Sequence, residues 1–134
     1  MSVLAVLIGV AHSEVNISVA EMTIDGFALR ALECSMEQGG FLAASVLVGA
    51  LAQHDAVLDA CAPEGAAFAV KWAWGVSVEA SVTASSKASA NDCIEAALRG
   101  TTPARNGQCT AVVLVGDVAA AAAASEALIP LASP

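Results

Sequence analysis

The strongest constraint on the fold is a regular alternation of residue types across the middle of the chain. One side of the alternation is apolar and bulky, and it holds Phe68, Val70, Trp72 and Trp74, between Ala67, Ala69, Lys71 and Ala73. After Gly75 the alternation resumes, with Val76, Val78, Ala80 and Val82 set between Ser77, Glu79, Ser81 and Thr83. A period of two is that of a half-buried β-strand. We therefore expect a bent strand or a hairpin about Gly75, with its tryptophans in a core or a subunit interface rather than in a stacking platform for a ring-shaped ligand.

Other segments have shorter or less regular patterns. Strands are predicted at residues 3–10, 15–19, 57–61 and 109–115, from apolar runs, alternation or β-branched residues. Apolar spacing near 3.6 residues predicts helices at 24–36, 41–53 and 118–128, and a further helix between Ser86, its expected cap, and Gly100. Pro63-Glu64-Gly65 is a predicted turn and Thr101 to Gly107 a predicted loop.

These elements fit one domain over residues 1–134, because the chain is too short for two independent cores. Strands and helices are mixed along it. The expected fold is α/β in the broad sense, an α+β two-layer sandwich whose mixed or antiparallel sheet carries helices mainly on one face.

Composition limits the partners. Hydrophobic residues make up 57% of the chain and charged residues 13%, against roughly 45–50% and about 25% in typical soluble domains. The charged residues are too few for the solvent-exposed surface of a monomer, so the composition predicts a homo-oligomer. The net charge of −8 disfavours nucleic acid and anionic membrane surfaces. The longest apolar stretch, Gly39 to Ala52, is shorter than the ~20 residues of a membrane span.

The four cysteines are Cys34, Cys61, Cys93 and Cys109, and none forms a CxxC pair. A chain of this size does not need disulfides to fold. We therefore expect free, buried thiols and a cytoplasmic location.

No motif for phosphate, zinc or acyl-transfer chemistry is present, so the sequence predicts no catalytic residue, no metal and no cofactor. The densest group of potential metal ligands is His54, Asp55, Asp59 and Cys61, whose spacing matches no defined site. We interpret His54 and the two aspartates as part of a solvated loop between a helix and a strand.

The segment from Arg105 to Ala120, RNGQCTAVVLVGDVAA, resembles the end of a bacterial microcompartment shell domain. There a glycine-containing loop leads into a β-branched strand, then Gly-Asp-Val and an alanine-rich helix. The resemblance implies a flat cyclic oligomer, tiled into a shell, with a pore lined by Arg105, Asn106 and Gly107. Such a pore would favour small anionic or polar metabolites.

Two hypotheses follow. The first is a non-enzymatic, self-associating structural subunit, of which the shell protein is the sharpest form. The alternative is a small oligomeric enzyme or ligand-binding protein, with an intersubunit site that uses His12, His54, Ser85 or Arg105.

Overall fold

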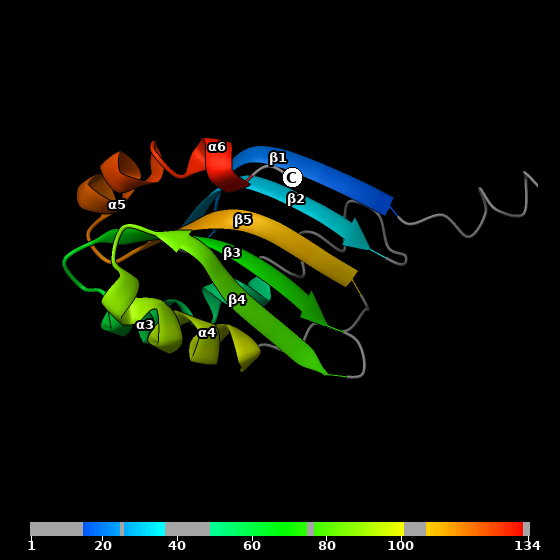
Figure 1. Cartoon of the computed structure of the whole chain (residues 1–134), viewed down its shortest axis with the longest axis horizontal. Coiled ribbons are helices and arrows are strands. Elements are labelled where there is room, and N and C mark those ends of the chain that lie inside the picture. Colours follow the sequence, from blue (N-terminus) through cyan, green and yellow to red (C-terminus); the bar gives the residue numbers. More distant parts are fainter. Residues whose placement is uncertain (1–14, 25, 37–48, 75–76, 101–106, 133–134) are drawn as a thin grey trace, which may run out of the picture.

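A computed structural model describes residues 15–24, 26–36, 49–74, 77–100 and 107–132 of the chain. Its strands form one five-stranded antiparallel sheet in the order β1-β2-β5-β3-β4 (Figure 1). They are β1 (Val15–Ile24), β2 (Phe27–Met36), β3 (Ala66–Trp74), β4 (Val78–Ser85) and β5 (Gly107–Val115). Helices accompany this sheet, so the predicted α+β class with an antiparallel sheet is confirmed.

The helices lie on both faces of the sheet. Helices α3 (Asp55–Cys61) and α4 (Asn91–Arg99) cover one face, and α5 (Val118–Ser125) and the short α6 (Ile129–Ala132) lie against the other (Figure 1). The larger core lies under α3 and α4 and contains Phe68, Ile94 and Leu98, while a smaller one joins Val112 to Leu128 of the α5–α6 turn. Helices were expected mainly on one face of the sheet. The larger core does lie on one face, under α3 and α4, but α5 and α6 cover the other face as well.

The predicted helix over residues 24–36 is wrong, because this segment is strand β2, paired with β1 across a turn at Gly26. A bulge explains the misleading pattern. Ala31 has φ of 52°, and the register with β5 shifts between Arg30 and Glu33. The extra residue separates the buried Leu29 from the buried Leu32 by three positions instead of two, which imitates a helical period.

The predicted strand over residues 15–19 is confirmed and extends to Ile24 as β1. The hairpin about Gly75 is also confirmed, because β3 and β4 pair in antiparallel register. Trp72 is 2% exposed and belongs to the larger core, as the alternation predicts.

Two further local predictions are wrong. Residues 57–61 form the end of α3 and not a strand. Ser86 does not cap α4, which begins at Asn91 after a 3₁₀ turn at Ala88–Ala90; its hydroxyl instead accepts a hydrogen bond from the Ala67 backbone N–H at 3.0 Å.

Some predictions are only partly covered. The turn at residues 63–64 is present, and residues 49–52 are helical, as expected for the end of the predicted helix over 41–53. The predicted strand at 3–10, the rest of that helix and most of the predicted loop at 101–107 lie outside the described residues.

The strand-to-helix segment at residues 109–128 matches its prediction closely. Strand β5 runs into α5 through Gly116, whose φ is 76°, and Asp117 caps the helix by accepting a hydrogen bond from the Ala120 backbone N–H at 3.0 Å. The Gly116 N–H donates to Asp59 of α3 at 2.8 Å, and the Asp117 N–H donates to the Pro63 carbonyl at 3.2 Å. The turn is therefore fixed against the end of α3.

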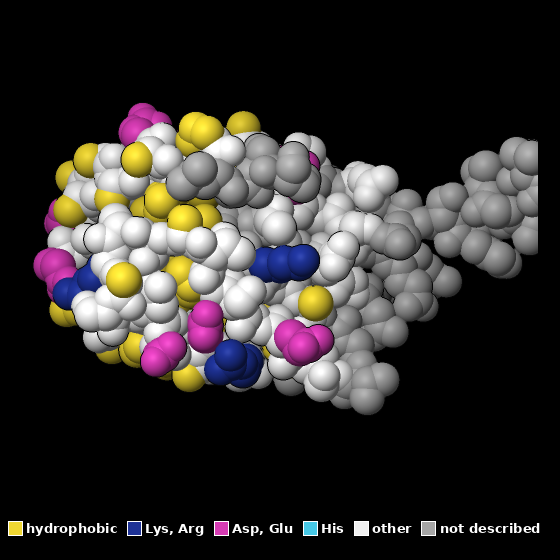
Figure 2. Space-filling view, in the orientation of Figure 1, with side chains coloured by type: hydrophobic (Ala, Val, Ile, Leu, Met, Phe, Trp, Pro, Cys, Tyr) yellow, Lys and Arg dark blue, Asp and Glu magenta, His cyan; other side chains and the backbone are white. Residues whose placement is uncertain are grey.

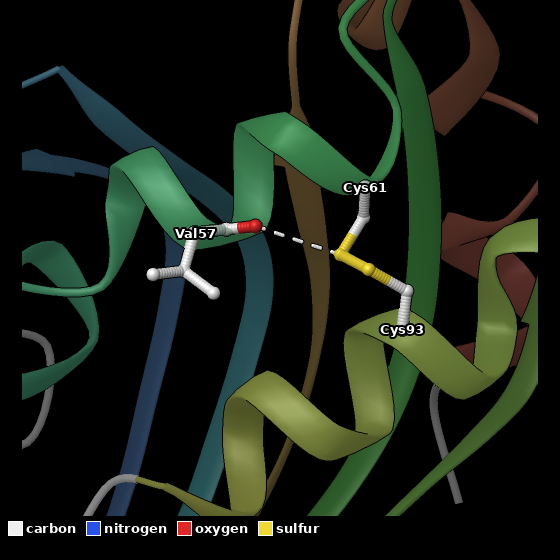
Figure 3. The surroundings of a disulfide bond; sticks show 3 residues. All are labelled: Val57, Cys61 and Cys93. Carbon is white, nitrogen blue, oxygen red and sulfur yellow. Dashed lines mark hydrogen bonds between the residues drawn. A yellow bond between two sulfur atoms is a disulfide. The ribbon is translucent and has the colours of Figure 1, made fainter.

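The prediction of free thiols is wrong, because the cysteines form two disulfides. Cys34 of β2 is bonded to Cys109 directly opposite on β5, and both are buried. Cys61 of α3 and Cys93 of α4 point toward each other and join the two helices near the surface (Figure 3). The Cys61 sulfur also lies 3.5 Å from the Val57 carbonyl oxygen, a contact without a shared proton since a disulfide sulfur carries no hydrogen.

Candidate functional site

The predicted pore residues fall at one end of the sheet. Arg105 and Asn106 lie outside the described residues. Gly107 is the first residue of β5 and stands opposite Met36 of β2 and Trp74 of β3. Gly107 therefore lies at the end of the sheet where β2 and β3 finish.

The group His54, Asp55, Asp59 and Cys61 is not a solvated loop, because it lies at the start of α3 and along it. Three of its four residues have a structural partner. Cys61 is in a disulfide, Asp59 accepts from Gly116, and His54 Nδ1 lies 3.3 Å from the Ala50 carbonyl oxygen. Burial, and then the nearby Asp59 carboxylate, raise the pKa of Asp55. Within the described ranges no three His, Cys, Asp or Glu side chains are placed to hold a metal ion.

Of the four residues of the alternative enzyme hypothesis, the two that the structure describes are not brought together. His12 and Arg105 lie outside the described residues. Ser85 ends β4, shortly before the N-terminus of α4, whereas His54 lies beside Gly100 at the other end of that helix. A nucleophile and a base need hydrogen-bond contact to act together, and His54 and Ser85 do not have it.

An open groove of about 430 Å³ runs along β4, lined by Lys71, Ala73, Val78, Glu79, Ala80, Ser81 and Arg99. Its charges have mixed sign. The Arg99 guanidinium is already engaged, since it donates to the Ala80 carbonyl at 3.3 Å and lies 3.5 Å from Glu95. Arg99 is therefore held by the fold and is not free to bind a ligand in this groove.

Side chains of α4 cap two backbone groups on the outer edge of β4. A Glu95 carboxylate oxygen accepts a hydrogen bond from the Val82 backbone N–H at 2.8 Å. Arg99, one turn further along α4, donates to the Ala80 carbonyl on the same edge. These contacts occupy backbone groups that another strand would need, and they are a known way of protecting a sheet edge.

The outer edge of β1 has no comparable protection among the described residues. β1 is ten residues long and pairs with β2 alone. Its one charged residue is Glu21, which lies 3.6 Å from Arg30 of β2. It has no lysine and no proline, the residues that usually protect such an edge.

The contrast between the two edges is the clearest functional geometry of the described structure. An open edge presents unpaired N–H and C=O groups that recruit another strand, whereas the capped edge does not. The sequence prediction missed both features. The i, i+4 spacing of Glu95 and Arg99 was visible, but its contact with β4 depends on tertiary packing.

Replacing Glu95 tests whether the cap keeps β4 from pairing. In Glu95→Ala the Val82 N–H loses its partner, so we expect β4 to recruit further strands and light scattering to record larger, concentration-dependent species. Glu95→Gln is the matched control, because its amide oxygen still accepts from Val82. Equal masses for wild type, Glu95→Ala and Glu95→Gln would show that the cap has no such role.

The surface in the view of Figure 2 carries few charged side chains. Figure 2 shows few Lys, Arg, Asp and Glu side chains on this face, and they form no patch of one sign. No helix in the described part of the chain is long and apolar enough to cross a lipid bilayer.

Comparisons of the chain with protein-family models, with curated proteins and with solved structures find no match.

Proposed function

We propose that the chain is a self-associating structural subunit. The observation that carries this proposal is a difference between the two sheet edges: α4 caps β4, whereas no residue in the described part of the chain covers the outer edge of β1. A monomer gains nothing from a long unprotected edge, because it invites aggregation. In a subunit, a copy of the same chain covers it. The charged content of 13% supports the same reading, since buried contact surfaces need few charges.

A microcompartment-like shell protein is the sharper form of this proposal. Its support is the local sequence resemblance over residues 105–120, together with a strand, Gly-Asp turn and alanine-rich helix in that order. Helix α5 also leaves Val118 71% exposed, at the start of an alanine-rich surface suited to close contact between copies. In this form Arg105, Asn106 and Gly107 line the pore for small anionic or polar metabolites.

The disulfides bear on where the chain works. The cytoplasmic location was predicted from free thiols, and that premise no longer holds. Disulfides persist mainly in oxidising compartments and are rare in the reducing cytosol. We therefore propose that the chain folds in an oxidising compartment.

The mass of the oxidised chain in solution tests self-association. We expect light scattering over a range of concentrations to give at least twice the mass of the chain. A monomer at every concentration would contradict the proposed function. The oxidised state matters, because reduction removes two crosslinks from the fold.

Imaging tests the shell form separately. Negative-stain micrographs of the concentrated chain are expected to show flat sheets or large rings. In an assembled shell, Arg105→Ala should change the passage of small anions, because it removes the only cation of the proposed pore loop. Small closed oligomers without sheets would contradict the shell form and leave self-association standing.

A further inference from the structure

We infer that β1 pairs with β1 of a second copy in antiparallel register about a two-fold axis between Val19 and Ala20, which makes one continuous ten-stranded sheet. This inference rests on the proposed self-association and names its interface. It adds the surface, the partner and the register, none of which self-association alone specifies.

The sequence of β1, VNISVAEMTI, is self-complementary about its centre. In the inferred register each position meets one of the same kind. Polar positions pair as Asn16 with Thr23 and Ser18 with Glu21, and apolar positions pair as Val15 with Ile24, Ile17 with Met22 and Val19 with Ala20. All ten residues of the strand are used, and no apolar position opposes a charge.

A register of this kind needs a strand whose two halves are offset. Residues directly opposite each other in an antiparallel pair lie on the same face of the sheet. In a regular strand, positions 18 and 21 lie on opposite faces because the side-chain period is two. A two-fold axis between Val19 and Ala20 would then oppose positions on different faces.

Strand β1 has the required offset. It is paired with β2 on both sides of the β2 bulge, with Val19 opposite Leu32 and Glu21 opposite Arg30. Leu32 is in the larger core, whereas Arg30 donates to Ser125 of α5, on the other face of the sheet, at 2.8 Å. The faces therefore change between Val19 and Glu21.

Packing of β1 against the core gives the same result. Val19, Met22 and Ile24 all contact the larger core, at separations of three and then two residues. On either side of the central Val19–Ala20 pair, the inferred register therefore brings core-side positions opposite core-side positions and polar positions opposite polar positions on the other face. The bulge that made β2 resemble a helix also makes β1 self-complementary.

Charge favours this register over one centred on Glu21. A register centred on Glu21 would oppose the Glu21 side chains of the two copies and would leave part of the strand unpaired. Like charges directly opposite each other are destabilising. In the inferred register Glu21 faces Ser18 and keeps its ion pair with Arg30.

The interface closes on itself. A two-fold contact uses the same surface on both copies, so it ends at two chains. The opposite edge of the resulting sheet is β4 of each copy, which α4 caps. Any assembly beyond two copies then has to use other surfaces.

Engineered disulfides test the register directly. Asn16 and Thr23 are both exposed. They stand seven positions apart on one strand, roughly 24 Å at about 3.4 Å per residue, so they cannot be bridged within a chain. In the inferred dimer, residue 16 of each copy is opposite residue 23 of the other.

We expect the double variant Asn16→Cys/Thr23→Cys to form a covalent dimer under mild oxidation, with a 16–23 link found by mass spectrometry of the digested protein. The single variants Asn16→Cys and Thr23→Cys are the matched controls. Each places its two new thiols far apart in the dimer, so neither should form a covalent dimer to a similar extent.

The outcomes separate the inference from the proposed function. Oligomeric wild type without a 16–23 link in the double variant would overturn the register and leave self-association intact. Equal crosslinking in the single variants would overturn it too, because it reports random collisions. Monomeric wild type at every concentration would overturn both.

A charge at the axis gives an independent readout. Ala20 is exposed and lies beside the two-fold axis, so Ala20→Lys brings two like charges together and should weaken dimerisation at least about tenfold, the factor that corresponds to about 1.4 kcal/mol. Ser77→Lys is the matched control, since Ser77 is exposed next to β4 and receives the same charge. Equal dissociation constants for the two variants would overturn the inferred interface.

Discussion

Gly116→Ala is expected to lower the free energy of unfolding by roughly 3 kcal/mol or more. The residue has φ of 76°, and strained conformations of this kind cost non-glycine residues about 1–3 kcal/mol. A Cβ at this position would also stand 2.1 Å from the Ala62 carbonyl oxygen and 2.8 Å from the Gly65 backbone nitrogen. Overpacking of this kind costs a further 1–3 kcal/mol, about as much as the strain. Chemical denaturation followed by circular dichroism measures the sum.

The matched control is Gly49→Ala. Gly49 is helical, and a Cβ there meets no atom within 4 Å, so alanine should leave stability unchanged or raise it slightly. A loss below about 1 kcal/mol in Gly116→Ala would mean that the turn between β5 and α5 can relax away from α3. The hydrogen bond from Gly116 to Asp59 would then not be fixed as described.

Removing the buried disulfide is expected to have the largest effect of any covalent change. In Cys34→Ala/Cys109→Ala the unfolded chain regains the freedom of a loop with a sequence separation of 75 residues, worth about 4 kcal/mol in the chain-entropy estimate. The pair also lies in the middle of the sheet between β2 and β5, and both residues are buried. The midpoint of denaturant unfolding should fall accordingly.

The second disulfide provides the comparison. Cys61→Ala/Cys93→Ala releases a separation of 32 residues, so the expected loss is somewhat smaller. Cys93 is exposed, and access controls thiol exchange, so dithiothreitol should reduce this bond before Cys34–Cys109. Mass spectrometry of alkylated samples gives the order. Simultaneous reduction of both bonds in native conditions would contradict the burial difference.

Sequence patterns predicted the parts of the fold that depend on local rules. The alternation over β3 and β4 indicated a hairpin, because a half-buried strand imposes a period of two on its residues. The β-branched run predicted strand β5, and apolar spacing near 3.6 residues predicted the helix that follows it. Each of these patterns is local, because the residues that form it lie within about a dozen positions of the element that it predicts.

Features that depend on distant contacts were missed. The bulge at Ala31 is fixed by pairing with β5, about 80 residues away, and it made β2 look helical. The cysteine spacing did not reveal the disulfides, because Cys34 and Cys109 meet only once β2 and β5 are adjacent. The cap of Glu95 on Val82 likewise needs α4 to pack on β4.

Hydrogen exchange of the β1 amides tests the central claim, that one sheet edge is open for a second copy and the other is capped. NMR at high and low protein concentration would follow the outward-facing N–H groups of β1 and the Val82 N–H of β4. The β1 amides are predicted to be protected at high concentration and to exchange rapidly on dilution, while Val82, bonded to Glu95, is protected at both. Fast exchange of the outward-facing β1 amides at both concentrations would contradict the account.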